Sequence, residues 1–203
     1  GRSRTTTTRR RPRGRRAVRA AGPLRGDHPG GGQGGGGAAG DSVAALKALL
    51  ESAKDQSSLV PVVDPQAALR CHELGIGASV ELDLGHSLEP RWGTPVRVHG
   101  HVTNVTDGNF KYVGGIYEGQ TGEMGPSAVV DVGAIRILIS SHATYDWADE
   151  QFRSMDMDPE LAKFIVVKNP MNFRVAYADK FQAAYILDTP GCTPATLRHI
   201  QHK

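Results

Sequence analysis

The stretch FIVVKNPMNFR, residues 164–174, carries the clearest fold signal in the sequence. Its first four residues form an uninterrupted apolar run, which is typical of a strand buried on both faces. A proline-containing turn follows and brings Lys168, Asn172 and Arg174 to the carboxyl end of that strand. Open α/β sheets usually bind ligands at that end, and an arginine offers a planar fork for a carboxylate or phosphate. The alternative is that Asn172 caps the next helix and Arg174 pairs on its surface.

Helices and strands alternate on both sides of this stretch. Short apolar runs predict strands at Leu59–Val63 and Ala183–Leu187. Asp64 and Pro65 predict the N-cap and first residue of a helix that ends at Gly75. Two more helices are expected at about residues 42–53, capped by Asp41 or Ser42, and at about residues 147–154.

The middle of the chain shows the two-residue period of half-buried strands. Residues 80–84 and 96–103 alternate apolar and polar side chains, and residues 128–140 read as a hairpin around Asp131-Val132-Gly133. Phe110–Val113 and Ile116–Tyr117 are expected to be further strand pieces. The predicted fold class is α/β (α+β), a single domain with a mixed sheet, antiparallel hairpins and flanking helices.

The charge is divided unevenly along the 203 residues. Residues 1–26 hold ten Arg and no acidic residue, whereas the remainder holds 14 basic and 21 acidic residues, a net charge of −7. We expect residues 1–26 to be an Arg-rich disordered tail, because they cannot bury enough apolar surface to offset the entropy of ordering. Residues 27–41, with eight glycines, read as a Gly-rich loop, and residues 42–203 as the folded domain.

The composition disfavours several functional classes. An Arg cluster binds phosphate, so a non-catalytic module with a nucleic-acid-contacting tail is the alternative function. Against it, the tail has no stacking aromatic residue and the body is acidic. No apolar run approaches the roughly 18 residues of a membrane span, and we expect a cytoplasmic protein. Two cysteines are too few for a disulfide scaffold.

Two pairs of residues have metal-binding or proton-transfer chemistry. Asp27 and His28 stand at the mouth of the Gly-rich loop, where a carboxylate and an imidazole can bind a metal or move a proton, or simply form a turn. His99 and His101 lie two apart on one strand, so both rings point the same way. Zinc needs a third protein ligand, and a self-contained site at this pair stays an open alternative.

The chain resembles the C-terminal domain of the microcystinase C (MlrC-like) metallopeptidases over about residues 27–195. Each matching segment is unspecific alone, but the order and spacing together are specific. The segments are Gly35–Asp41 with the helix after it, Val62–Pro65 leading to Gly75–Ala78, Met124–Val129 with its hairpin, and Asp158–Pro159 through Ile165–Lys168 to Asn172–Arg174.

The resemblance implies a zinc-dependent hydrolase that acts on a peptide or amide substrate. The family's zinc ligands are expected outside this chain, in an N-terminal metal-binding domain that it lacks, so we expect a truncated chain that is inactive alone. The family's Asp-Asn-Pro-Gly-Gly-Gly loop aligns in two ways. Anchored on Asp27, with His28 in place of Asn, it makes these two residues the catalytic candidates; anchored on Gly35–Asp41, it loses the acid.

The resemblance also assigns supporting roles. Asp41, Lys168, Asn172 and Arg174 would bind substrate or brace the loop. A homo-oligomer stays an open alternative, and nucleic acid is disfavoured as a partner.

Overall fold

The computed structural model describes residues 17–21, 40–146, 149–169, 173–177, 183–187 and 189. Three of the elements are short 3-10 turns, η1 (Pro90–Trp92), η2 (Gly115–Tyr117) and η3 (Pro159–Leu161). The helices are α1 (Ala44–Ser52), α2 (Pro65–Leu74), α3 (Glu150–Arg153) and α4 (Phe173–Ala176). The strands are β1 (Ala17–Ala21), β2 (Ser58–Val63), β3 (Ser79–Leu84), β4 (Val96–Thr106), β5 (Asn109–Lys111), β6 (Thr121–Glu123), β7 (Ser127–Val132), β8 (Ile135–Ser140), β9 (Phe164–Val167) and β10 (Ala183–Leu187).

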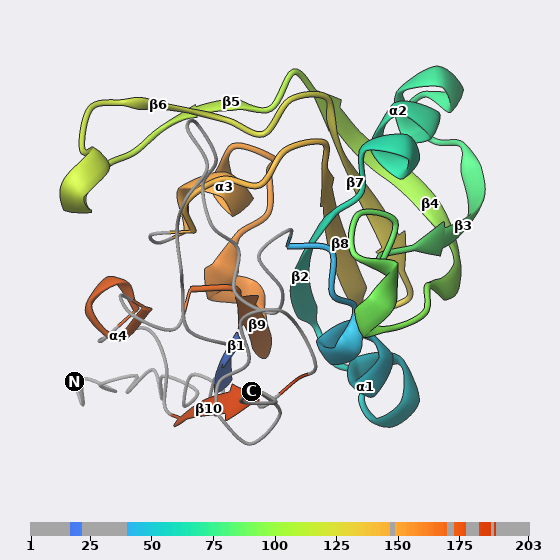
Figure 1. Cartoon of the computed structure of the whole chain (residues 1–203), viewed down its shortest axis with the longest axis horizontal. Helices are drawn as coiled ribbons and strands as arrows, with labels where there is room; N and C mark the ends of the chain where they lie inside the picture. The colour runs from blue at the N-terminus through green and yellow to red at the C-terminus, as the bar shows by residue number, and fades with distance from the viewer. Residues whose placement is uncertain are drawn as a thin grey trace, which may run out of the picture.

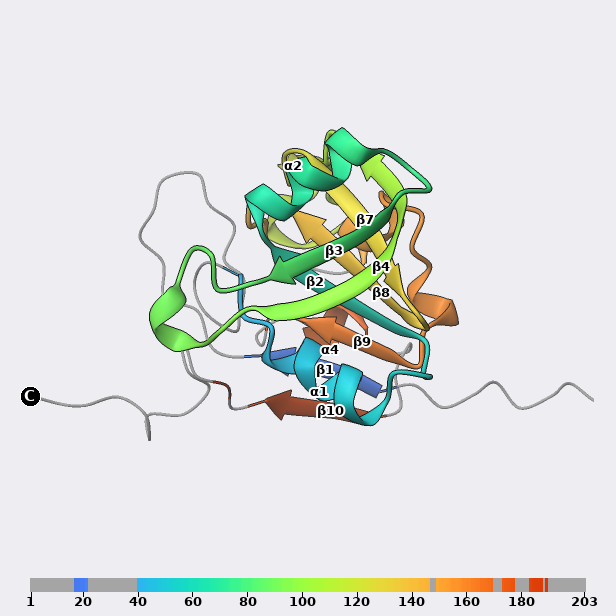
Figure 2. The ribbon, with the colours of Figure 1, turned by 90° about the vertical axis from the view of Figure 1, so that its right-hand side faces the viewer.

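Eight strands form one mixed sheet in the order β10-β1-β9-β2-β8-β7-β4-β3, seen along the molecule in Figure 2. The first five of these strands are mutually parallel. The last four, from β8 to β3, pair antiparallel. The predicted α/β (α+β) fold with a mixed sheet and antiparallel hairpins is therefore confirmed. The sheet has a parallel half, which contains the 164–167 strand, and an antiparallel half.

A hydrophobic core lies on each face of the sheet. Neighbouring residues of a strand point to opposite faces, so in β9 Val166 enters the core under α1 and α2, whereas Ile165 and Val167 enter the other core. Phe152 of α3 and Phe173 of α4 fill that second core. Figure 1 shows α1 and α2 on one side of the sheet, and α3 and α4 on the other. Burial on both faces explains why β9 reads as a continuous apolar run.

The helix α2 matches its sequence signal, and α1 departs from it. Asp64 caps α2 by accepting a hydrogen bond from the Ala67 N–H at 3.2 Å, and Gly75 follows the last turn with φ +79°. In α1 the N-cap is Val43, with no side-chain cap. The expectation that Asp41 or Ser42 caps α1 is wrong, because the Asp41 carboxylate binds a different loop, as described below.

The strand β1 lies inside the Arg-rich segment. All five of its residues pair with β10, and four of them also pair with β9. The expectation of a disordered tail over residues 1–26 is therefore wrong for Ala17–Ala21. This segment has few large apolar side chains, but pairing on both sides provides hydrogen-bond partners for its backbone N–H and C=O groups. The other residues of that segment lie outside the described part of the chain.

An arm formed by β5, η2 and β6 extends from the main sheet along the side that carries α3 (Figure 1). The expected strand pieces reduce here to Asn109–Lys111, and Ile116–Tyr117 belongs to a 3-10 turn. The side chains of Phe110 and Tyr112 anchor the arm in the second core. None of the helices in the described ranges is both long and apolar enough to cross a membrane.

Candidate functional site

The carboxyl ends of β9, β2 and β8 lie side by side because these strands are parallel. We call this the carboxyl edge; it is the edge at which open α/β sheets bind ligands. Lys168 directly follows β9, and Asp64 directly follows β2. Both side chains are buried. The carboxyl edge therefore holds charged groups shielded from water, which an ordinary surface loop does not.

The Lys168 ammonium group holds the end of the Gly-rich segment. Its Nζ donates to the carbonyl oxygen of Gly40, and to that of Ser42 at 3.1 Å. The Gly40 carbonyl also accepts the Val63 N–H at the end of β2, at 3.2 Å. The residue that follows β9 and the last residue of β2 thus both donate to one carbonyl group, three positions after the last glycine of residues 30–37.

Gly40 is required at this position by its backbone and its surroundings. Its φ is +74°, a left-handed conformation that glycine adopts without steric cost. A Cβ placed there would lie 2.7 Å from Cγ2 of Val63, well inside van der Waals contact. The close approach of the Gly40 backbone to β2 is what brings its carbonyl within reach of Lys168.

Two buried aspartates fix the loop that follows β3. The Asp41 carboxylate accepts the N–H groups of Leu88 and Glu89 at 3.0 and 2.8 Å. The Asp64 carboxylate accepts the Gly85 N–H at 3.0 Å in addition to capping α2. Each buried carboxylate is compensated by backbone donors, which offsets its cost of desolvation. Asp41 therefore braces the loop of residues 85–89 against the carboxyl edge.

Asp146 is a third buried acid at this edge, and it contacts Lys168 through the backbone. Its Oδ2 accepts the Lys168 N–H at 2.8 Å. Burial raises the pKa of Asp146 to about 7, against the opposing effects of this hydrogen bond and of the Lys168 charge. Burial also lowers the pKa of Lys168 to about 8, while attraction to Asp41 and Asp146 acts in the other direction. Burial therefore moves the pKa values of the two groups toward each other, up for the acid and down for the lysine.

The sequence offered no signal for Asp146. It stands in a loop six positions after the end of β8, outside any motif. Asp146 contacts Lys168 because β9 lies beside that loop. This position of β9 depends on its parallel pairing with β2, which lies more than a hundred residues earlier in the chain.

The structure brings some predicted residues together and separates others. Asp41 and Lys168 belong to one buried cluster, since Lys168 holds the carbonyls on either side of Asp41. Arg174 is exposed, and its guanidinium lies over the Phe173 ring at 5.5 Å, so Lys168 and Arg174 occupy different environments rather than one binding group. Asp27, His28 and Asn172 lie outside the described residues.

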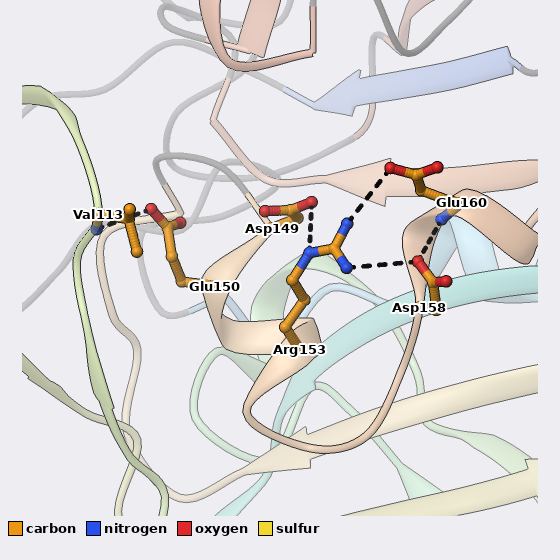
Figure 3. Close-up of polar contacts among 6 residues, drawn as sticks. All are labelled: Val113, Asp149, Glu150, Arg153, Asp158 and Glu160. Atoms are coloured by element: carbon orange, nitrogen blue, oxygen red, sulfur yellow. Dashed lines mark hydrogen bonds and ion pairs between the residues drawn. The ribbon is translucent and has the colours of Figure 1, made fainter.

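Figure 3 shows how α3, which follows Asp146, is held in place. Arg153 contacts Asp149 at 2.9 Å, and it reaches Asp158 and Glu160 at 3.5 and 3.8 Å, which ties α3 to the turn before β9. Glu150 accepts the Val113 N–H of the arm at 3.1 Å. The pairs of Arg153 are partly exposed and each is weak, but together they tie α3 to the turn before β9, while Glu150 ties α3 to the arm.

The residues at the carboxyl edge do not fit a metal ion. Within the described ranges, no three His, Cys, Asp or Glu side chains form a group that could hold one. The groups that attract positive charge, Asp41 and Asp146, accept backbone N–H groups and already interact with the charge of the Lys168 ammonium. This cluster is suited to holding a backbone segment rather than a cation.

Three comparisons place the chain among known proteins. The family model described as "MlrC C-terminus" matches residues 26–203. Microcystinase C from Sphingomonas sp. is 26% identical over 153 residues, which is 75% of this chain and 28% of that protein. A crystal structure of a candidate metallopeptidase from Mesorhizobium sp. BNC1 superposes with a TM-score of 0.77 at 20% identity, over 92% of this chain and 36% of that one.

The chain thus spans about a third or less of the length of these relatives. At 20% identity the crystal structure supports the mixed-sheet fold. The family model covers nearly all of the chain from the Gly-rich segment onward, which confirms the family resemblance seen in the sequence. This chain belongs to the MlrC C-terminus family.

Proposed function

We propose that this chain is the C-terminal domain of a zinc-dependent hydrolase that cleaves peptide or other amide bonds. Its relatives are a microcystinase and a candidate metallopeptidase, of which the matched parts make up 28% and 36%. In this proposal the metal ligands come from a domain outside this chain. The part described here supplies the scaffold that presents the Gly-rich segment to the reaction centre.

This proposal rests on the hydrogen bonds that Lys168 Nζ donates to the Gly40 and Ser42 carbonyls. A buried ammonium that donates to two carbonyls of one strand-to-helix connection leaves that connection little freedom. The Gly-rich segment therefore leaves the carboxyl edge from a fixed point. A loop with a fixed base can place its residues reproducibly against a substrate, as catalysis requires.

Each predicted site residue has a part in this proposal. Asp27 and His28 handle protons at the mouth of the Gly-rich segment. Lys168 and Asp41 brace the connection, because both are buried and their polar contacts go to backbone groups. Arg174 is exposed, so it is the residue available to bind a carboxylate of a peptide. Asn172 positions the substrate beside it.

The proposal is tested by metal analysis and a peptide-cleavage assay on the purified chain. We expect no cleavage from the chain alone, whether or not zinc is bound to it. We expect zinc-dependent cleavage when residues 17–203, which include β1, replace the matching C-terminal part of microcystinase C. Stoichiometric zinc together with full activity in this chain alone would contradict the proposal.

A further inference from the structure

A second group of titratable side chains lies on the antiparallel half of the sheet, on one exposed face of β3 and β4. His99 and His101 of β4 pair directly with Glu81 and Ser79 of β3. All four lie on the same face of these two strands, and none is buried. They line a hollow of about 480 Å³, with Asp131 on its rim.

Nδ1 of each imidazole lies beside an oxygen atom of β3. Nδ1 of His101 lies 3.2 Å from the Ser79 hydroxyl, and Nδ1 of His99 lies 3.6 Å from the Glu81 carboxylate. An imidazole whose Nδ1–H faces an oxygen acceptor carries its lone pair on Nε2. Metal-binding histidines are oriented in this way by a neighbouring carboxylate or another oxygen acceptor.

We propose that His99 and His101 bind one divalent transition-metal ion of the Zn²⁺, Ni²⁺ or Cu²⁺ class through their Nε2 atoms. Residues two apart on a strand are separated by about 7 Å. Two imidazole rings can span that separation with metal–nitrogen bonds of about 2 Å each.

The surrounding charge favours a cation. Arg97 shares this face, but it is paired with Glu81 at 3.1 Å and with Asp83 at 2.6 Å, so these three residues carry a net charge of −1. Asp131 is paired with Arg136 at 3.2 Å. No third His, Cys, Asp or Glu completes a group in the described ranges, so the pair lacks the third protein ligand of a permanent zinc site. It is proposed as a two-histidine site that binds weakly, in the micromolar range, with water in the remaining positions.

Calorimetric titration of the whole chain with ZnCl₂ tests this site. We expect micromolar binding by the wild type and at least a tenfold loss of affinity in the double variant H99Q/H101Q. The matched control is H199Q/H202Q, which removes two other closely spaced histidines and should bind as the wild type does. Unchanged affinity in H99Q/H101Q, or loss in the control instead, would overturn the proposal.

The orientation by Glu81 has its own test. Replacing an acceptor behind a metal-bound histidine lowers affinity by about tenfold or more. We therefore expect E81Q to weaken zinc binding while D83N, on the same strand face, has a smaller effect. Equal affinities in E81Q and the wild type would refute the assigned role of Nδ1. None of these measurements depends on the proposed hydrolase function.

Discussion

The Lys168 ammonium group donates a hydrogen bond to the carbonyl oxygen of Gly40, 128 positions earlier in the chain. This contact joins the end of β9 to the connection that leads into α1, and it is buried. The backbone N–H of Lys168 in turn donates a hydrogen bond to the Asp146 carboxylate. The parallel half of the sheet thus determines where the Gly-rich segment ends.

Replacing Lys168 by Met should destabilise the fold and loosen this connection. The variant keeps the apolar stem, but it removes the ammonium donor from the Gly40 and Ser42 carbonyls, of which Gly40 keeps the Val63 N–H, and it leaves two buried acids without a cation. We expect the free energy of unfolding to fall by about 2–4 kcal/mol in urea denaturation. The matched change at exposed Lys54 should leave the free energy of unfolding within about 0.5 kcal/mol of wild type. Equal effects at the two positions would refute the bracing role of Lys168.

The stability difference between D146N and wild type should depend on pH. Burial raises the pKa of Asp146 from 3.8 to about 7, so the folded state binds more protons than the unfolded chain between these values. Stability from this group is therefore lost as pH rises from about 4 to 7. Asn does not titrate, so urea melts should show D146N gaining on the wild type across that range.

A difference between D146N and wild type that stays flat from pH 4 to 7 would show that Asp146 does not titrate as a buried acid.

Replacing Gly40 by Ala should lower the free energy of unfolding more than the same change at Gly119. Both glycines have positive φ, +74° and +79°, and an added Cβ meets nothing within 4 Å at Gly119 but meets Val63 at 2.7 Å at Gly40. We expect a loss of about 1 kcal/mol for G119A from the backbone alone, and about 1–3 kcal/mol more for G40A from overpacking. Thermal or urea unfolding measures both, and equal losses would argue against close packing of Gly40 on β2.

Asp64 and Asp158 are both helix caps, which makes them a matched pair. Asp158 is partly exposed and caps the 3-10 turn η3 by accepting the Glu160 N–H. Asp64 is buried, and it also accepts the Gly85 N–H. We expect the free energy of unfolding to fall by about 1 kcal/mol in D158A and by about 2–3 kcal/mol in D64A. Hydrogen exchange should then show a faster Gly85 amide in D64A; an unchanged rate would contradict the second contact.

Much of the local structure could be predicted because short-range signals determine it. The Asp64-Pro65 start and the Gly75 end of α2 depend on capping and backbone geometry within one helix. The bounds of Ala183–Leu187 and of the 164–167 strand follow from apolar runs. These features need no knowledge of the rest of the chain.

The parts that sequence reasoning missed all depend on contacts between distant segments. Ala17–Ala21 looks disordered in isolation and becomes a strand because β9 and β10 pair with it. Asp41 looks like a cap for α1, but its carboxylate meets the N–H groups of Leu88 and Glu89. Asp146 becomes notable when β9 lies beside its loop. No local pattern encodes these three outcomes.

The proposed hydrolase function is tested most sharply by peptide cleavage in a chimera of microcystinase C that carries residues 17–203 of this chain. We expect cleavage that is abolished by a chelator and restored by zinc. We also expect at least a tenfold lower rate when the chimera carries K168M. A chimera that folds and binds zinc but does not cleave, or one in which K168M cleaves as fast as the parent, would contradict the proposed function.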